Sequence, residues 1–128
     1  MELTGGLFIG GERRQSHARF HAYDPAAGAD IADAGFASAS EQDVADACAA
    51  AEAAFLPYST KPLEARARFL ETIAGEIEAL GDVLIERACR ESGLPATRIT
   101  GERGRTVGQL RLFAKEVRDG AWQKLRID

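Results

Sequence analysis

The sequence predicts a mainly α-helical fold of about four helices, preceded by a small antiparallel β-element at the N-terminus. Two observations lead to this prediction. Apolar residues recur at three- and four-residue steps over most of the stretch from residue 40 to residue 120, as on one face of an α-helix. Residues 1–39 instead carry short apolar runs separated by glycines and by an Asp-Pro step, which is typical of strands and turns.

The segment from Pro62 to Gly81 is the helix around which we expect the rest to pack. Pro62 suits a first helical turn, and Gly81 suits the position just after a helix end. A long apolar stripe cannot stay bare in water, so the other segments should cover it. Glu71, Glu76 and Glu78 are expected on the solvent side. The stripe consists of Leu63, Ala67, Leu70, Ile73, Ala74, Ile77 and Leu80.

The N-terminal element is predicted from its turns. Gly10 and Gly11 follow a short apolar run, Leu7–Ile9, and indicate a hairpin. A second strand is expected over Phe20–Tyr23, ending in a turn over Asp24–Gly28, and residues 31–39 form a third extended segment. So small a β-element must pack on the helices.

Three further helices are predicted from their end signals. The first begins with a capping box, Ser40 to Asp43, and should end before Pro57. A third helix is capped by Asp82 and ended by Gly93, and a fourth runs from Pro95 to about Gly120.

The fourth helix carries an unusual number of glycines, at positions 101, 104 and 108. Each costs up to about 1 kcal/mol relative to alanine in a helix interior. We therefore expect another backbone or a bulky side chain to approach the helix closely there. The same segment lacks the spacing and the preceding strand of a phosphate-binding loop.

The last residues, 121–128, alternate in polarity as a strand does, and the chain then stops with no turn or cap. We expect a chain cut at this point. The predicted organisation is a β-hairpin and extended segment over 1–39, a helical part over 40–120, and over 121–128 the start of a strand leading to a missing remainder.

Composition excludes several classes of protein. The 128 residues are 45% hydrophobic and 28% charged, as in a soluble globular protein, and the net charge of -4 argues against a nucleic-acid binder. No apolar run is long enough to cross a bilayer, and no secretion signal is visible, so a cytoplasmic location is expected. Cys48 and Cys89 are interpreted as buried free thiols in a reducing compartment.

No catalytic or metal-binding constellation stands out. His17 and His21 have no serine, cysteine or acid at a spacing that suggests a triad, so surface or packing roles are expected. Arg103, Arg105 and Arg111 could form a basic patch for an anionic substrate. Because Glu102 lies among them, a solvated mixed-charge helix face is the favoured interpretation.

The order of six short motifs resembles that of aldehyde dehydrogenases. Within this family, residues 101–114 (GERGRTVGQLRLFA) most resemble the branch that oxidises α-ketoglutarate semialdehyde, 2,5-dioxopentanoate. The motifs that carry the resemblance are FIGGE (8–12), DPAAG (24–28), the helix 40–55, ARARFL (65–70) with Ile73-Ala74, ESGLP (91–95) and LRLFA (110–114).

The resemblance implies that this chain is the N-terminal part of the α/β cofactor domain of a longer, NAD- or NADP-dependent enzyme. In that family a cysteine thiolate attacks the aldehyde, hydride passes to the cofactor and water releases the carboxylate. No position here matches the family's catalytic or cofactor-binding motifs, so no catalytic, cofactor-binding or metal residue is assigned and no cofactor is expected on this chain. Neither Cys48 nor Cys89 is the nucleophile.

Arg105 and Arg111 are the substrate-entrance candidates implied by the resemblance, since either could attract the distal carboxylate of a dicarboxylic semialdehyde. The chain itself is then an inactive scaffold, with exposed helix faces that favour a homo-oligomer. Two alternatives remain open, a stand-alone helical interaction module without enzymatic activity and, less favoured, a small helical enzyme.

Overall fold

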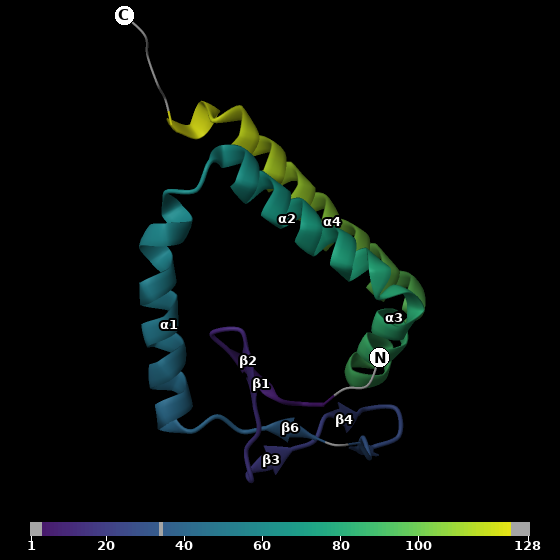
Figure 1. Cartoon of the computed structure of the whole chain (residues 1–128). Coiled ribbons are helices and arrows are strands. Elements are labelled where there is room, and N and C mark those ends of the chain that lie inside the picture. The colour runs from purple at the N-terminus through teal and green to yellow at the C-terminus, as the bar shows by residue number, and fades with distance from the viewer. Residues whose placement is uncertain (1–3, 34, 124–128) are drawn as a thin grey trace, which may run out of the picture. The chain divides into compact units, whose positions relative to one another are not determined.

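The computed structural model describes residues 4–33 and 35–123, and these form two compact units. The first unit contains the described residues up to Thr60 together with Arg90–Gly93. The second contains Lys61–Cys89 and the described residues from Leu94 onward. Short strands precede four helices and a final 3-10 helix in the chain (Figure 1), so the predicted fold class is confirmed.

The predicted hairpin is present in the first unit. Strand β1 (Leu7–Ile9) pairs antiparallel with β2 (Glu12–Arg14), with Phe8 opposite Arg13. The two turn residues, Gly10 and Gly11, have φ values of 60° and 88°. A two-residue turn with both φ values positive matches the twist of the paired strands, and glycine adopts it without strain.

The predicted strand over Phe20–Tyr23 is in fact two strands with different partners. Strand β3 (Arg19–Phe20) pairs with β6 (Phe36–Ala37), and β4 (Tyr23–Asp24) pairs with β5 (Ala29–Asp30). The expected third extended segment is therefore split: β5 lies before it, and only β6 lies within it. Ile31, which follows β5, is 1% exposed and forms the centre of this unit's small core.

The turn over Asp24–Gly28 is confirmed by its hydrogen bonds. The Gly28 N–H donates to the Asp24 carbonyl at 2.8 Å, and the Asp24 carboxylate accepts from the N–H groups of Ala26 and Ala27. An aspartate that accepts from the backbone in this way closes a tight turn locally. The same hydrogen bonds, with that from Ala27 the largest cause, lower the pKa of Asp24.

Helix α1 (Glu41–Ser59) begins with the predicted capping box. The Ser40 hydroxyl accepts from the Asp43 N–H, and the Asp43 carboxylate accepts from the Ser40 N–H at 2.9 Å. We expected the helix to end before Pro57, but it continues to Ser59. Hydroxyls of Ser59 and Thr60 donate to the Leu56 carbonyl at 3.0 Å, which supplies the last turn with donors beyond the proline.

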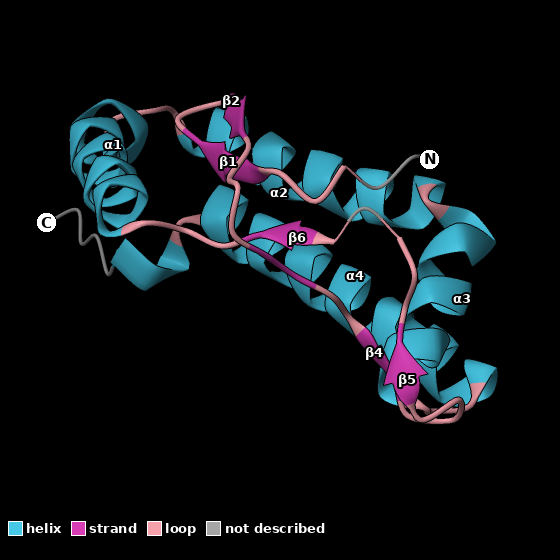
Figure 2. Cartoon of the chain, turned by 90° about the horizontal axis from the view of Figure 1, so that it is seen from below, coloured by secondary structure: helices cyan, strands magenta, loops and turns pink. Residues whose placement is uncertain are grey.

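In the second unit, α2 (Leu63–Ala79) and α4 (Ala96–Asp119) run antiparallel and side by side (Figures 1 and 2). Their contact is built from small residues. Ala67, Ala74 and Ala114 are fully buried and Val107 is 3% exposed, so the two backbones approach closely. The predicted stripe of the central helix does face a partner helix.

One side of this helix pair is bound by ion pairs. Arg118 of α4 donates to both Glu64 and Glu71 of α2, and Arg111 donates to Glu78 at 2.5 and 3.1 Å. Glutamates at every seventh position therefore line up along one side of α2, opposite the arginines of α4. Glu71 and Glu78 are exposed, as expected for the solvent side, and at the edge of the helix pair they also bind these arginines.

Helix α3 (Gly81–Ser92) follows α2 directly. Gly81, with a φ of 57°, both ends α2 and starts α3, so Asp82 lies in the first turn and is not the cap. Gly93, with a φ of 70°, follows the end of α3 as predicted. Arg103 of α4 donates to the Gly81 carbonyl at 3.0 Å and so contacts the end of α2.

The prediction for the glycines of α4 is wrong within the described part of the chain. A Cβ atom built at Gly101, Gly104 or Gly108 would meet no side chain or distant backbone within 4 Å. Gly101 and Gly108 lie on a different side of α4 from the buried Val107 and Ala114, and Gly104 lies at the edge of the side that those two residues share.

Helix α4 ends at Gly120, whose left-handed φ of 68° is the expected end signal. The expected strand over 121–128 is not present at its start, because Ala121–Gln123 form a 3-10 helix, η1. The rest of that prediction, 124–128, lies outside the described residues. Across the described helices, none is long and apolar enough to cross a membrane.

Candidate functional site

The described residues contain no recognisable catalytic or metal centre. No group of three or more His, Cys, Asp or Glu side chains among them is placed to hold a metal ion. His17 and His21 are exposed, in line with a surface role. Cys48 is exposed on α1 and Cys89 is half-buried on α3, so the expectation of two buried thiols is wrong for Cys48. No residue of α1 is buried among the described parts of its unit, and the Cys48 thiol is open to solvent accordingly.

The arginines of α4 are all paired with an acceptor on α4 itself or on a neighbouring helix. The Arg105 Nε donates to Glu102 at 3.0 Å, and Arg98 also reaches that carboxylate, at 2.7 Å. Arg111 is held by two hydrogen bonds to Glu78. The two predicted substrate-entrance residues therefore project from different sides of α4, and among the described residues they do not share one basic patch.

The electrostatics of this helix face follow from these contacts. The hydrogen bond from Arg105, and then its charge and that of Arg98, lower the pKa of the Glu102 carboxyl. The Arg105 side chain nevertheless remains 70% exposed, whereas that of Arg111 is 54% exposed and bound through two nitrogens. An incoming carboxylate could reach Arg105 with less rearrangement than Arg111.

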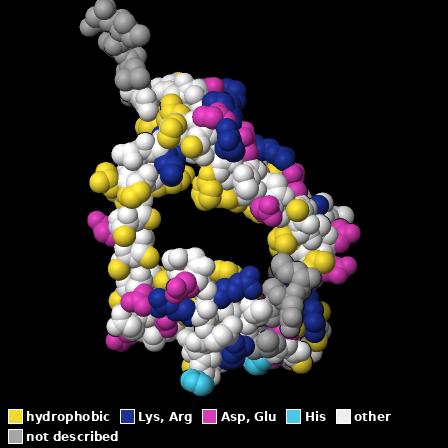
Figure 3. Space-filling model, viewed as in Figure 1, with side chains coloured by type: hydrophobic (Ala, Val, Ile, Leu, Met, Phe, Trp, Pro, Cys, Tyr) yellow, Lys and Arg dark blue, Asp and Glu magenta, His cyan; other side chains and the backbone are white. Residues whose placement is uncertain are grey.

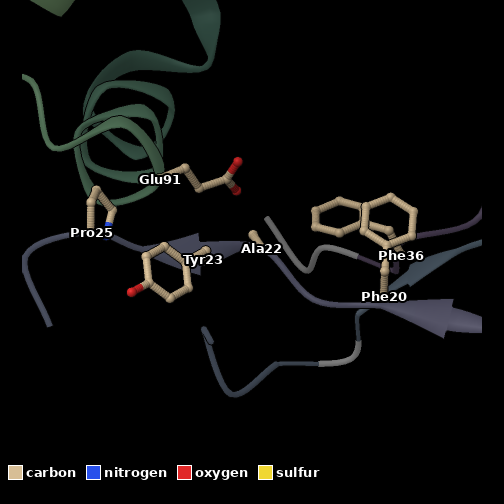
Figure 4. A pocket seen from close by; sticks show the side chains of 6 residues that line it. All are labelled: Phe20, Ala22, Tyr23, Pro25, Phe36 and Glu91. Carbon is tan, nitrogen blue, oxygen red and sulfur yellow. The ribbon is translucent and has the colours of Figure 1, made fainter. Parts of the chain in front are cut away.

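An open hollow of about 520 Å³ lies on the first unit (Figure 4). The rings of Phe20 and Phe36 stack with their centroids 5.6 Å apart, and the Glu91 carboxylate stands across from them. Aromatic faces with one carboxylate can bind a ligand, but they supply no nucleophile with its base. The remaining lining residues are Ala22, Tyr23 and Pro25.

One ion pair fixes the wall of this hollow. Arg90, near the end of α3, donates to the Asp24 carboxylate at 3.3 Å, and so joins Arg90–Gly93 to the turn between β4 and β5. Nothing in the sequence pattern indicates this hollow, because Phe20 and Glu91 are far apart in the chain. It depends on the folded arrangement alone.

Comparison with known proteins shows the family to which this chain belongs. Residues 12–128 match the aldehyde dehydrogenase family, and the chain belongs to that family. The family predicted from the motif order is thus confirmed. Over its whole length the chain is 54% identical to "Alpha-ketoglutaric semialdehyde dehydrogenase 2" of Azospirillum brasilense, of which it covers 25%.

Two further relatives are also named as semialdehyde dehydrogenases. An alpha-ketoglutaric semialdehyde dehydrogenase of Acinetobacter baylyi is 47% identical over 73% of the chain and 18% of that protein. N-succinylglutamate 5-semialdehyde dehydrogenase 2 of Caulobacter vibrioides is 40% identical over 67% of the chain and 16% of that protein. The chain thus spans a quarter or less of the length of these relatives.

A nicotinamide cofactor, which the resemblance implies for the whole enzyme, does not fit the described residues. Dinucleotides bind where parallel strands end in a glycine-rich turn at a helix N-terminus. The strands described here have two or three residues each and pair antiparallel. Helices α2 and α4 instead begin after Pro62 and Pro95, so the described part of the chain forms no such cradle.

Proposed function

We propose that this chain is the N-terminal part of an NAD- or NADP-dependent aldehyde dehydrogenase that oxidises α-ketoglutaric semialdehyde to the carboxylate. The observation that carries this proposal is the 54% identity to the Azospirillum brasilense enzyme, which runs over the entire chain. Two other similar relatives are named for semialdehydes, that is, aldehydes with a remote carboxyl group. The substrate class is therefore supported by several proteins and not by one name.

The chain itself acts as a scaffold and does not turn over substrate. The described residues supply no thiol with a neighbouring base and no cradle for the cofactor. Its helices provide structure for the rest of the enzyme, and their exposed faces favour a homo-oligomer. With a sequence pI of about 5.2 and no basic surplus, neither nucleic acid nor membrane is a partner, and the enzyme works in the cytoplasm.

Within this proposal, Arg105 and Arg111 attract the distal carboxylate of the substrate at its entrance. Arg105 contributes more, because its side chain is more exposed and, among the described residues, it shares the acceptor Glu102 with Arg98. Arg111 contributes less, because Glu78 already binds two of its nitrogens. The charge of an arginine suits a carboxylate, which it can bind through two nitrogens.

The test is a chimera in which this chain replaces the corresponding quarter of the Azospirillum brasilense relative. NAD(P)H formation is followed with α-ketoglutaric semialdehyde and with a plain aliphatic aldehyde, for the chimera and for the chain alone. We expect the chimera to prefer the semialdehyde and the chain alone to be inactive. A folded chimera without activity, or turnover by the isolated chain, would contradict the proposal and favour an interaction module or a small enzyme.

The arginine roles are tested in the same chimera. Arg105→Ala should raise KM for the semialdehyde several-fold, Arg111→Ala should raise it less, and neither should change KM for the aliphatic aldehyde. Arg98→Ala is the matched control, because it removes a charge from the same helix face. Equal KM values for the semialdehyde in all variants would rule out both residues as substrate contacts.

A further inference from the structure

Helix α4 carries two arginine–glutamate pairs of different geometry. In Figure 3, charged side chains of both signs lie close together along one side of the α2–α4 pair. Arg111 uses both terminal nitrogens, Nη1 and Nη2, on the two oxygens of Glu78, at 3.1 and 2.5 Å. Arg105 instead uses its inner nitrogen, Nε, on one oxygen of Glu102 at 3.0 Å. The two pairs therefore leave different edges of the guanidinium open.

The open edge of Arg105 is the one that suits a carboxylate. Its Nη1 and Nη2 have no acceptor in the part of the chain that the structure describes, and its side chain is 70% exposed. These two nitrogens form a fork that can bind both oxygens of a carboxylate at once. The same fork of Arg111 is already occupied by Glu78.

Glu102 is the more firmly placed member of its pair. Its side chain is 35% exposed and borders an apolar hollow of about 410 Å³ between α2, α3 and α4. Its second oxygen lies 2.7 Å from Arg98, so both oxygens are in use. The hydrogen bond from Arg105, then its charge and that of Arg98, lower the pKa of Glu102 and keep its carboxyl charged at neutral pH. A carboxylate held in this way can fix the direction of a long, exposed side chain.

We propose that Glu102 is a positioning residue for the substrate: it holds Arg105 by Nε so that the two terminal nitrogens face the distal carboxylate of the semialdehyde. Glu78 has the opposite effect on Arg111, because it occupies the nitrogens that this carboxylate would need. The inference rests on the proposed function, in which Arg105 attracts the substrate, and it names the residue that prepares Arg105 for that contact.

Charge alone would give Glu102 the opposite effect on substrate binding. Arg98, Glu102 and Arg105 together carry one positive charge in excess, and removal of Glu102 would increase that excess and attract an anion more strongly. Positioning instead predicts weaker binding, because the substrate must then order a free arginine side chain, which costs roughly two- to tenfold in affinity. The sign of the change in KM therefore separates the two explanations.

The experiment measures KM and kcat of the chimera of this chain with the Azospirillum brasilense relative. Glu102→Ala should raise KM for α-ketoglutaric semialdehyde about threefold or more, and should leave kcat and the KM for a plain aliphatic aldehyde unchanged. Glu102→Gln keeps one acceptor oxygen for the Arg105 Nε, so its KM should lie between the two. A lower KM in Glu102→Ala would overturn the proposal in favour of a charge effect.

A double-mutant cycle shows whether Glu102 acts through Arg105. In the Arg105→Ala background, Glu102→Ala should change KM for the semialdehyde no further. A further rise would mean that Glu102 acts by another route, and the proposal would then be wrong. Glu78→Ala provides the contrast, because it frees the fork of Arg111, and KM for the semialdehyde should not rise.

Glu116→Ala is the matched control, because it removes the same charge from an exposed position further along α4. Its KM and kcat should equal those of the unchanged chimera, and circular dichroism reports whether each variant keeps its helices. If Glu102→Ala does not fold, Glu102→Leu takes its place with the same expectation, since leucine keeps the volume beside the apolar hollow.

The outcomes distinguish this inference from the proposed function. A folded but inactive chimera contradicts the proposed function, and the positioning role falls with it. An active chimera that prefers the semialdehyde but whose KM is insensitive to Glu102→Ala contradicts the positioning role alone.

Discussion

Arg118 of α4 donates hydrogen bonds to both carboxylate oxygens of Glu71 of α2, at 2.9 and 3.0 Å. The same guanidinium also reaches Glu64, one helical heptad earlier, at 2.7 Å. One arginine therefore spans two positions of the facing helix and fixes how far α4 can slide along α2. Flat bidentate contacts of this type are more directional than those of a lysine.

The first prediction concerns pH. The hydrogen bonds from Arg118, then its charge, lower the pKa of Glu64 and Glu71 below the usual 4.5. A carboxyl with a lowered folded-state pKa contributes stability above its unfolded pKa, and that contribution is lost as pH falls through the folded value. We expect Tm to fall from about pH 5 downward, and to fall less in Arg118→Gln, as measured by thermal circular dichroism.

Lys115→Gln is the control for this experiment, because Lys115 forms an ion pair with Asp119 within α4 and does not reach α2. Its pH profile should match that of the unchanged chain. If the Tm of Arg118→Gln falls with pH as steeply as that of the unchanged chain, protonation of Glu64 and Glu71 does not depend on their contact with Arg118.

The second prediction concerns the alanines between α2 and α4. Ala74→Leu should destabilise the chain by about 1–3 kcal/mol, because a larger side chain in a filled contact forces the helices apart. Ala74 is 0% exposed, whereas Ala65 on the same helix is exposed. Ala65→Leu should therefore be nearly neutral in urea unfolding, and equal losses for the two variants would contradict close packing at Ala74.

The third prediction contrasts glycines within and after α4. Gly104→Ala should stabilise the chain by up to about 1 kcal/mol, because alanine has the higher helix propensity and no described atom stands in its way. Gly120→Ala should destabilise it, since Gly120 has a φ of 68° and its added Cβ would lie 3.4 Å from Leu63. We expect urea unfolding to show changes of opposite sign in the free energy of unfolding for these two variants. A loss of stability at Gly104 would mean that another part of the protein approaches α4 there.

The fourth prediction tests the start of α1. Ser40→Ala should cost about 0.5–2 kcal/mol, because the first turn loses the hydroxyl that accepts from the Asp43 N–H. Ser59→Ala, at the other end of the same helix, removes a hydroxyl whose acceptor Leu56 keeps a second donor in Thr60. Its effect should be smaller, and the reverse order of the two effects in thermal unfolding would contradict the capping role.

Local signals were sufficient for most of the helices. Ser40 acts through its own side chain, and Pro62 and Gly120 act through their own backbone geometry, so their positions in the sequence indicate helix ends correctly. Pro57 misled because, this close to the helix end, it removes only the hydrogen bond to the Ala53 carbonyl, and the turn after it is still closed by the Thr60 N–H and the hydroxyls that donate to Leu56. The strands were predicted less well, since Phe20 and Tyr23 pair with partners that no local pattern identifies.

The candidate sites were harder to predict from the sequence than the strands. Motif order indicated the family, but the partners of Arg105 and Arg111 were not visible in the sequence. Glutamates at positions 64, 71 and 78 were a signal that could have been used, because a seven-residue spacing lines them up on one side of a helix. Glu71 and Glu78 do face solvent, as expected, but that expectation did not identify the arginines that they bind.

By itself the sequence determined the four helices and the glycine hairpin, because capping and turn chemistry act between near neighbours in the chain. It also determined the family, because the order of the motifs can be read along the chain without the fold. The tertiary structure alone decided that alanines form the α2–α4 contact, that Glu71 and Glu78 bind arginines, and that Arg66 lies over Trp122. Those contacts join residues tens of positions apart. They depend on which helix sides meet, and a single helix's periodicity cannot specify its partner.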